Sequence, residues 1–167
     1  MQTLKENHQS DSPLLLSGLG GWLILAQIGL WGTACSAIIN IVFNILPIFN
    51  NGQWEELTDP GSNSYNSMWS IAIPYEMIGS LVLLVALAVA FTLFYRKKRL
   101  LRSFLIYFYI AYAVYSLGDY FMIQSIPEIQ DLGVSDSLTA LIRTLITCVI
   151  WASYYGKSIR VRNTFVR

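Results

Sequence analysis

The sequence predicts an all-α integral membrane protein, a bundle of four transmembrane helices with both termini on the cytoplasmic side. Of the 167 residues, 54% are hydrophobic and only 13% are charged. Soluble domains average about 45–50% apolar and about 25% charged residues, so the apolar excess indicates a lipid environment. A bundle of this kind uses nearly the whole length, which predicts a single four-helix transmembrane domain over residues 1–167.

The first apolar run extends from Leu14 to Phe49. One straight helix over this run would exceed the hydrocarbon core, which is about 30 Å thick. We therefore expect the span to cover residues 22–46, beginning at Trp22 and ending before Pro47, with Leu14 to Gly21 in the cytoplasmic interface.

Three more spans follow, at residues 69–95, 103–126 and 137–156. The connection over residues 50–68 is rich in turn-forming residues and is expected to be the largest aqueous loop. A shorter connection follows the third span and carries Glu128, Asp131 and Asp136. Short connections between the spans favour antiparallel neighbours.

The basic residues are distributed asymmetrically along the chain. Neither the first nor the third connection contains a Lys or Arg. The second connection and the C-terminal tail hold nearly all of them: Arg96, Lys97, Lys98, Arg99 and Arg102, then Lys157, Arg160, Arg162 and Arg167. Because Lys and Arg accumulate in cytoplasmic loops, both termini are predicted to be cytoplasmic.

Three ionisable residues lie inside the predicted spans: Glu76, Asp119 and Arg143. Each costs about 2.5–3.5 kcal/mol at a helix centre, so they are expected to lie at one level and to contact one another. We hypothesise that Arg143 pairs with both carboxylates, leaving a negative charge for a shared proton or a bound cation. The alternative, a network that only specifies helix packing, stays open.

Polar and small residues recur every three or four positions in each span, which places them on one face of each helix. In the first span this stripe includes Asn40 and Asn44, which are expected to face the charged cluster. The stripes are Gly29, Thr33, Ser36, Asn40 and Asn44; Glu76 and Ser80; Tyr109, Tyr112, Ser116 and Asp119; and Thr139, Arg143 and Thr147.

The sequence carries no recognisable catalytic, metal or cofactor motif. His8 is the only histidine, and it lies in the N-terminal segment ahead of the first span. No phosphate-binding loop, nucleophile elbow or paired-cysteine site is present. We therefore expect no catalytic residue, no metal, no cofactor and no enzymatic activity. The net charge of +1 likewise does not favour nucleic acid.

The basic connection, Arg96, Lys97, Lys98, Arg99 and Arg102, is a candidate contact for anionic lipid headgroups. Retention of the loop in the cytoplasm explains the same charges. The tail after Ser158 is short, basic and partly apolar, so interfacial anchoring and docking on a partner both stay open.

Several segments resemble the bacterial family called domain of unknown function 2569. They are Gly18 to Leu25, Trp69 with Glu76, Asp119, and the ending Trp151 to Phe165. The resemblance implies a four-helix protein of the bacterial inner membrane without an assigned reaction. It also implies that Glu76, Asp119 and Arg143 occupy positions that the family fills with such residues, whereas Ser80 stands where asparagine is expected.

These observations favour a non-enzymatic accessory or assembly subunit of a membrane complex. The alternative is a small transporter or a protein that conducts protons or other cations through the intramembrane Glu, Asp and Arg cluster. Besides the lipid bilayer, a membrane-protein partner and a second copy of the chain both stay open as neighbours. The small residues Ala86 and Ala90 mark one surface for such packing.

Overall fold

The computed structural model describes residues 20–127 and 134–166, with the side chains of residues 134–136 left out. His8, Gly18, Glu128 and Asp131 therefore lie outside the described residues. No strand occurs in the described part of the chain. Its helices are α1 (Trp22–Asn40), the π-helix η2 (Ile41–Ile45), α2 (Leu46–Asn50), α3 (Gln53–Thr58), α4 (Trp69–Tyr95), α5 (Leu100–Gln124), α7 (Val134–Lys157) and α8 (Ile159–Thr164).

The predicted all-α membrane architecture is confirmed, because the described residues include four helices long and apolar enough to cross a membrane. They are Trp22–Asn50, Trp69–Tyr95, Leu100–Gln124 and Ser137–Lys157. The second agrees with its predicted bounds. The third begins at Leu100, ahead of the expected start at Ser103, because Leu101 is already buried in the core and the basic turn is correspondingly shorter.

The first span does not end before Pro47, as the sequence predicted. The chain instead forms a π-helical turn at Ile41–Ile45, and the Leu46 amide donates to the carbonyl of Ile41, five residues back. Pro47 then falls in the first turn of α2, where its missing N–H removes no essential bond. The wider turn before Pro47 thus lets the helical path continue to Asn50.

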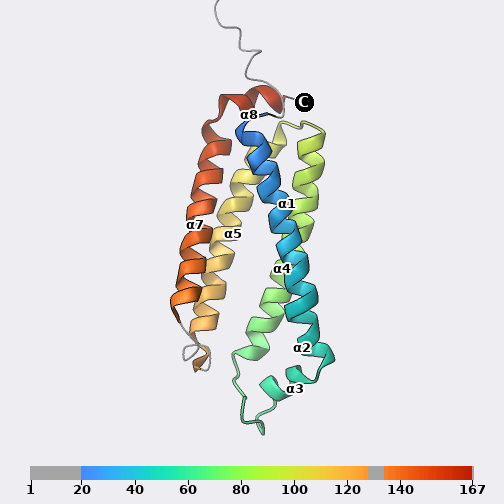
Figure 1. The fold of residues 1–167 in the computed structure, drawn as a ribbon, viewed down its shortest axis with the longest axis vertical. Coiled ribbons are helices and arrows are strands. Elements are labelled where there is room, and N and C mark those ends of the chain that lie inside the picture. Colours follow the sequence, from blue (N-terminus) through green and yellow to red (C-terminus); the bar gives the residue numbers. More distant parts are fainter. Residues whose placement is uncertain (1–19, 128–133, 167) are drawn as a thin grey trace, which may run out of the picture.

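Figure 1 shows that the start of α1, the turn between α4 and α5, and α8 lie at one end of the molecule. We call this the basic end, since it carries the turn from Arg96 to Arg99 and the residues of α8. Helices α2 and α3 lie at the opposite end, which we call the loop end (Figure 1). The four spans therefore run alternately up and down.

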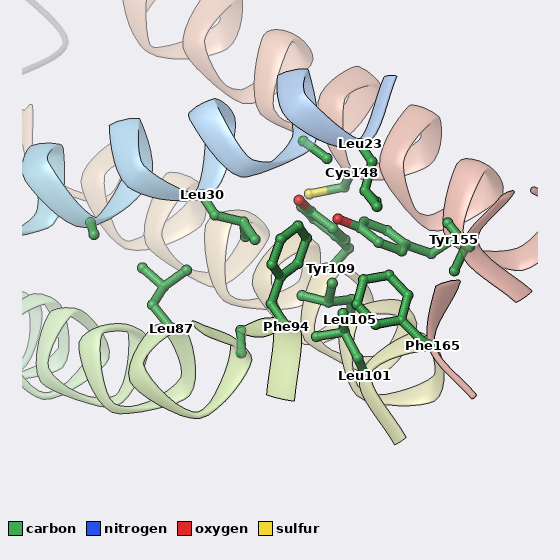
Figure 2. Packing of buried hydrophobic residues seen from close by; sticks show 14 residues of the cluster. Leu23, Leu30, Leu87, Phe94, Leu101, Leu105, Tyr109, Cys148, Tyr155 and Phe165 are labelled. Carbon is green, nitrogen blue, oxygen red and sulfur yellow. The ribbon is translucent and has the colours of Figure 1, made fainter. Parts of the chain in front are cut away.

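The hydrophobic core lies toward the basic end, where all four spans converge (Figure 2). Helix α8 and the residue that follows it contribute to this core, because Val161 and Phe165 are buried in it. The C-terminal tail thus packs on the bundle itself, with the Ser158 hydroxyl accepting a hydrogen bond from the Val161 amide. The labelled core residues are Leu23, Leu30, Leu87, Phe94, Leu101, Leu105, Tyr109, Cys148, Tyr155 and Phe165.

The surface suggested by Ala86 and Ala90 is not free for a second copy. Ala90 is 0% exposed and belongs to the core, because its face of α4 points inward to the other spans. Only Ala86 remains half-exposed.

Two tyrosines and two glycines interlock α4 with α5. The rings of Tyr75 and Tyr115 stack with their centroids 4.9 Å apart, and the Tyr75 hydroxyl donates to the Tyr115 carbonyl at 3.0 Å. A Cβ on Gly79 would overlap the ring of Tyr115, and one on Gly118 would lie 2.7 Å from the Tyr75 hydroxyl. Because glycine has no side chain, each of the two leaves the space that a tyrosine of the other helix occupies.

Replacing Gly79 with alanine should destabilise the bundle, because the ring of Tyr115 has to move. Overpacking usually costs about 1–3 kcal/mol, and the gain of about 1 kcal/mol in helix propensity offsets part of it, so we expect a net loss of up to about 2 kcal/mol. Thermal unfolding in detergent micelles measures the change. In the control Gly32→Ala, the added Cβ meets no atom within 4 Å. Equal melting temperatures for the two variants would contradict this packing.

Candidate functional site

A cavity of about 790 Å³ lies between α1, α4, α5 and α7, on the loop-end side of the hydrophobic core. Tyr109 and Cys148 belong both to its lining and to the core, so the packed side chains of the core form its floor. The polar residues that line it are Thr33, Ser36, Asn40, Glu76, Ser80, Tyr109, Tyr112, Tyr115, Ser116, Asp119, Tyr120, Ser137, Arg143, Thr144 and Thr147.

The polar stripes of the four spans meet around this cavity. Of the predicted cluster, Asn40, Glu76, Asp119 and Arg143 all line it. Asn44 lies one turn beyond Asn40 and does not belong to the lining. The helices bring these residues together because each polar residue lies three or four positions from the next and thus on the same face of its helix.

Hydrogen bonds connect the first span to Glu76 on α4. The Asn40 amide nitrogen donates to Oε1 of Glu76 at 2.9 Å, and the Asn44 amide nitrogen donates to Oδ1 of Asn40 at 2.8 Å. Asn40 ends α1 and Asn44 lies in the π-helical turn. Turns of this kind are frequent at functional sites, and here the turn belongs to the segment that binds the half-buried carboxylate of Glu76.

The structure does not contain the ion pairs that we hypothesised between Arg143 and the two carboxylates. Among the described residues, no ion pair joins Arg143 to Glu76 or to Asp119, although all three line the same cavity. Asp119 is half-buried and accepts no hydrogen bond from any described residue, whereas Arg143 is exposed. The cavity therefore holds charges of both signs that do not neutralise each other directly.

The cavity lining has a less exposed wall on two helices and an exposed rim on the other two. The lining residues of α4 and α5, including Glu76, Ser80 and Asp119, are buried or half-buried. The exposed lining residues lie on α1 and α7, and they include Ser36, Arg143 and Thr147. Successive spans pack in the order α1, α4, α5, α7, without a closely packed pair of α1 and α7 in the described residues. The mouth of the cavity therefore lies between α1 and α7.

Aromatic residues that the stripe analysis did not include complete the walls. Phe108, Tyr120 and Trp151 line the cavity beside Tyr112 and Tyr115. Trp151 lies four residues after Thr147, so the same helical period that placed Thr147 also indicates Trp151. Phe108 likewise precedes Tyr112 by four positions.

The basic turn contains two kinds of residue. Arg96, Lys97, Lys98 and Arg99 are exposed, and contact with lipid headgroups stays a prediction for them. Arg102 instead turns toward α7, where its Nε donates to the Tyr155 carbonyl at 3.1 Å and its Nη2 to the Gly156 carbonyl at 2.6 Å. This half-buried guanidinium satisfies two carbonyls at the end of a helix, a role that periodicity alone does not indicate.

Comparison with known proteins identifies the family of the chain. Residues 16–166 match the family described as Protein of unknown function (DUF2569). The chain belongs to this family. The resemblance in the sequence of this DUF2569 protein is thereby confirmed, over both its opening and its closing segments. No curated protein and no solved structure was found to match the chain.

The cavity of this DUF2569 protein does not have the donor set of a metal centre. Within residues 20–127 and 134–166, no group of three or more His, Cys, Asp or Glu side chains is placed to hold a metal ion. Among the side chains that the structure describes, Glu76 and Asp119 are the carboxylates that line the cavity. Its chemistry is thus that of two acids, one guanidinium, several hydroxyls and aromatic rings.

Removal of the Arg102 side chain should destabilise the basic end. Arg102→Ala leaves the Tyr155 and Gly156 carbonyls without their donors, and hydrogen bonds to a charged group contribute about 1.5–3 kcal/mol. Arg102→Lys keeps the charge but loses the planar guanidinium group that reaches both carbonyls, so a smaller loss of stability is expected. Thermal unfolding compares both with Arg99→Ala, which alters an exposed residue of the same turn. If Arg102→Ala and Arg99→Ala unfold at the same temperature, the contact with α7 has no energetic role.

Proposed function

We propose that this protein is a small, non-enzymatic carrier of the bacterial inner membrane that binds a proton or another cation at Glu76 and Asp119. The observation that supports this function most strongly is the shared cavity, because it exposes two carboxylates and one guanidinium without a direct ion pair between them. Ionisable groups at membrane depth are costly, and in known proteins they mark ion pathways and proton relays. The excess negative charge of the cavity favours a positive ligand.

The cavity does not continue through the bundle, which supports a carrier rather than an open pore. Toward the basic end, the core closes the path with side chains such as Leu23, Leu30 and Tyr155, each at most 1% exposed. The opening of the cavity lies instead in the seam between α1 and α7, where its lining residues are exposed. A cation bound at Glu76 and Asp119 is therefore reached through this seam and not through the core, as expected of a carrier in one of its conformations.

The orientation belongs to the same proposal. The basic end carries Arg96, Lys97, Lys98 and Arg99 in the turn, together with Arg160 and Arg162 of α8. Positive residues are retained in the cytoplasm, so the basic end and both termini are assigned to that side. The cavity, which lies on the loop-end side of the core, then lies in the outer half of the membrane.

A second candidate, the accessory or assembly subunit, is favoured by the open seam itself. Ser36, Arg143 and Thr147 are exposed along α1 and α7, at a depth where lipid tails cannot bind polar groups. A transmembrane helix of another protein with acceptor side chains would cover this seam and pair with Arg143. Native mass spectrometry after gentle extraction decides this candidate, since a stoichiometric second polypeptide supports it.

Cation flux into proteoliposomes tests the carrier. The purified protein should carry protons or sodium ions down a gradient, and Glu76→Gln or Asp119→Asn should reduce the flux to that of empty vesicles, because each change removes a charge from the cavity. The matched control is Glu55→Gln, which alters an exposed carboxylate of α3 outside the cavity. Both cavity variants must still insert and elute as the wild type does. Flux that is unchanged in properly inserted variants would exclude the carrier.

A further inference from the structure

The charges of the cavity specify the sign of a ligand. Glu76 and Asp119 contribute two negative groups and Arg143 one positive group, all in the lining. Oε1 of Glu76 accepts one bond from Asn40, while Asp119 has no hydrogen-bond donor among the described residues. Because Arg143 lies on the exposed rim of α7, the buried part of the cavity is the more negative one. A singly charged cation fits this arrangement.

Two largely buried residues contribute hydroxyl groups to the lining of the cavity. Ser80 and Tyr109 are each 7% exposed, and both line the cavity. Neither side chain forms a hydrogen bond with another described residue. Hydroxyl groups without a protein partner usually bind water or a ligand, so the cavity is expected to hold water or a polar molecule beside these residues.

The walls indicate what kind of cation enters. Phe108, Tyr112 and Tyr115 form a continuous row along α5, with successive ring centroids 6.3 Å apart at both steps. Trp151 lines the cavity from α7. Aromatic faces attract organic ammonium groups, whereas calcium and magnesium require six or more oxygen ligands. In the described part of the chain, no cluster of three or more carboxylate, His or Cys side chains offers such a shell.

The volume of the cavity is suitable for a small organic ligand. Its volume of about 790 Å³ lies within the range of about 300–1,000 Å³ that is usual for sites of small organic molecules. A bare ion or a proton would leave most of this space to water. The apolar part of the walls, which includes Leu83 and Ile123, would contact the alkyl groups of a larger ligand.

We infer that the cavity binds a small organic cation of the alkylammonium class, with its nitrogen at Glu76 and Asp119 and its alkyl groups against Tyr112 and Tyr115. The inference rests on the proposed carrier function and adds the class of its substrate. The rim position of Arg143 places a positive charge at the mouth, which disfavours multivalent cations. Ser80 and Tyr109 supply hydroxyl groups for the polar end of the ligand or for its water.

Calorimetric titration of the full-length protein in detergent micelles tests this inference. The probes are choline and its neutral carbon isostere, in which a carbon atom replaces the quaternary nitrogen. Choline should bind at one site, and the isostere at least about tenfold more weakly, because it lacks the charge that Asp119 and the aromatic rings attract. Asp119→Asn should reduce this difference, because Glu76 and the aromatic rings remain. Equal binding of the two probes, or binding of neither, would overturn the inference.

Variants of Tyr112 distinguish binding through the aromatic ring from binding through charge attraction alone. Tyr112→Leu should weaken choline binding by about threefold to tenfold, whereas Tyr112→Phe, which keeps the ring face, should bind as the wild type does. The control Tyr107→Leu changes a tyrosine of the same helix that is 72% exposed and does not line the cavity. Equal weakening by Tyr112→Leu and Tyr107→Leu would contradict an aromatic site. Proton flux that depends on Glu76, without choline binding, would overturn the ligand class and leave the carrier function intact.

Discussion

The cost of placing an ionisable group inside a bilayer constrains the rest of this structure. Glu76, Asp119 and Arg143 each lie within a helix long and apolar enough to span a membrane. Such groups require a polar partner or water, which lipid tails do not provide. The bundle meets this requirement by dividing its length into two parts. The spans converge on an apolar core at the basic end, and they separate around a polar cavity toward the loop end.

Different side-chain contacts stabilise the two parts of the bundle. Tyr75 and Tyr115 hold α4 and α5 together beside the cavity through the spaces at Gly79 and Gly118. At the other end, α8 covers the core and Arg102 binds the last carbonyls of α7. The α1–α7 seam has no comparable interlock in the described residues. The molecule therefore has a natural opening at this seam, where a ligand or a partner helix meets the charged groups.

The local sequence pattern was sufficient to predict four spans and several polar residues that line the cavity. Apolar length located the second span from Trp69 to Tyr95, and the three-to-four residue period placed Asn40, Glu76, Asp119 and Arg143 on facing stripes. Features that depend on contacts between distant segments could not be predicted in this way. The helix continues through Pro47 because of a π-helical turn, and Arg102 faces α7 because the ends of α5 and α7 meet. Periodicity also gave no indication that the charges would surround a cavity instead of forming an ion pair.

The most direct test of the account is the water accessibility of the seam between α1 and α7. In a background with Cys35 and Cys148 replaced by alanine, single cysteines at Ser36 and Thr147 are exposed to a charged, membrane-impermeant thiol reagent. Val149, which is 66% exposed on α7 but does not line the cavity, provides the lipid-facing control. An open polar cavity predicts rapid labelling at Ser36 and Thr147 and none at Val149. Equal protection of all three positions would show that the cavity is closed to water, and would contradict the central claim.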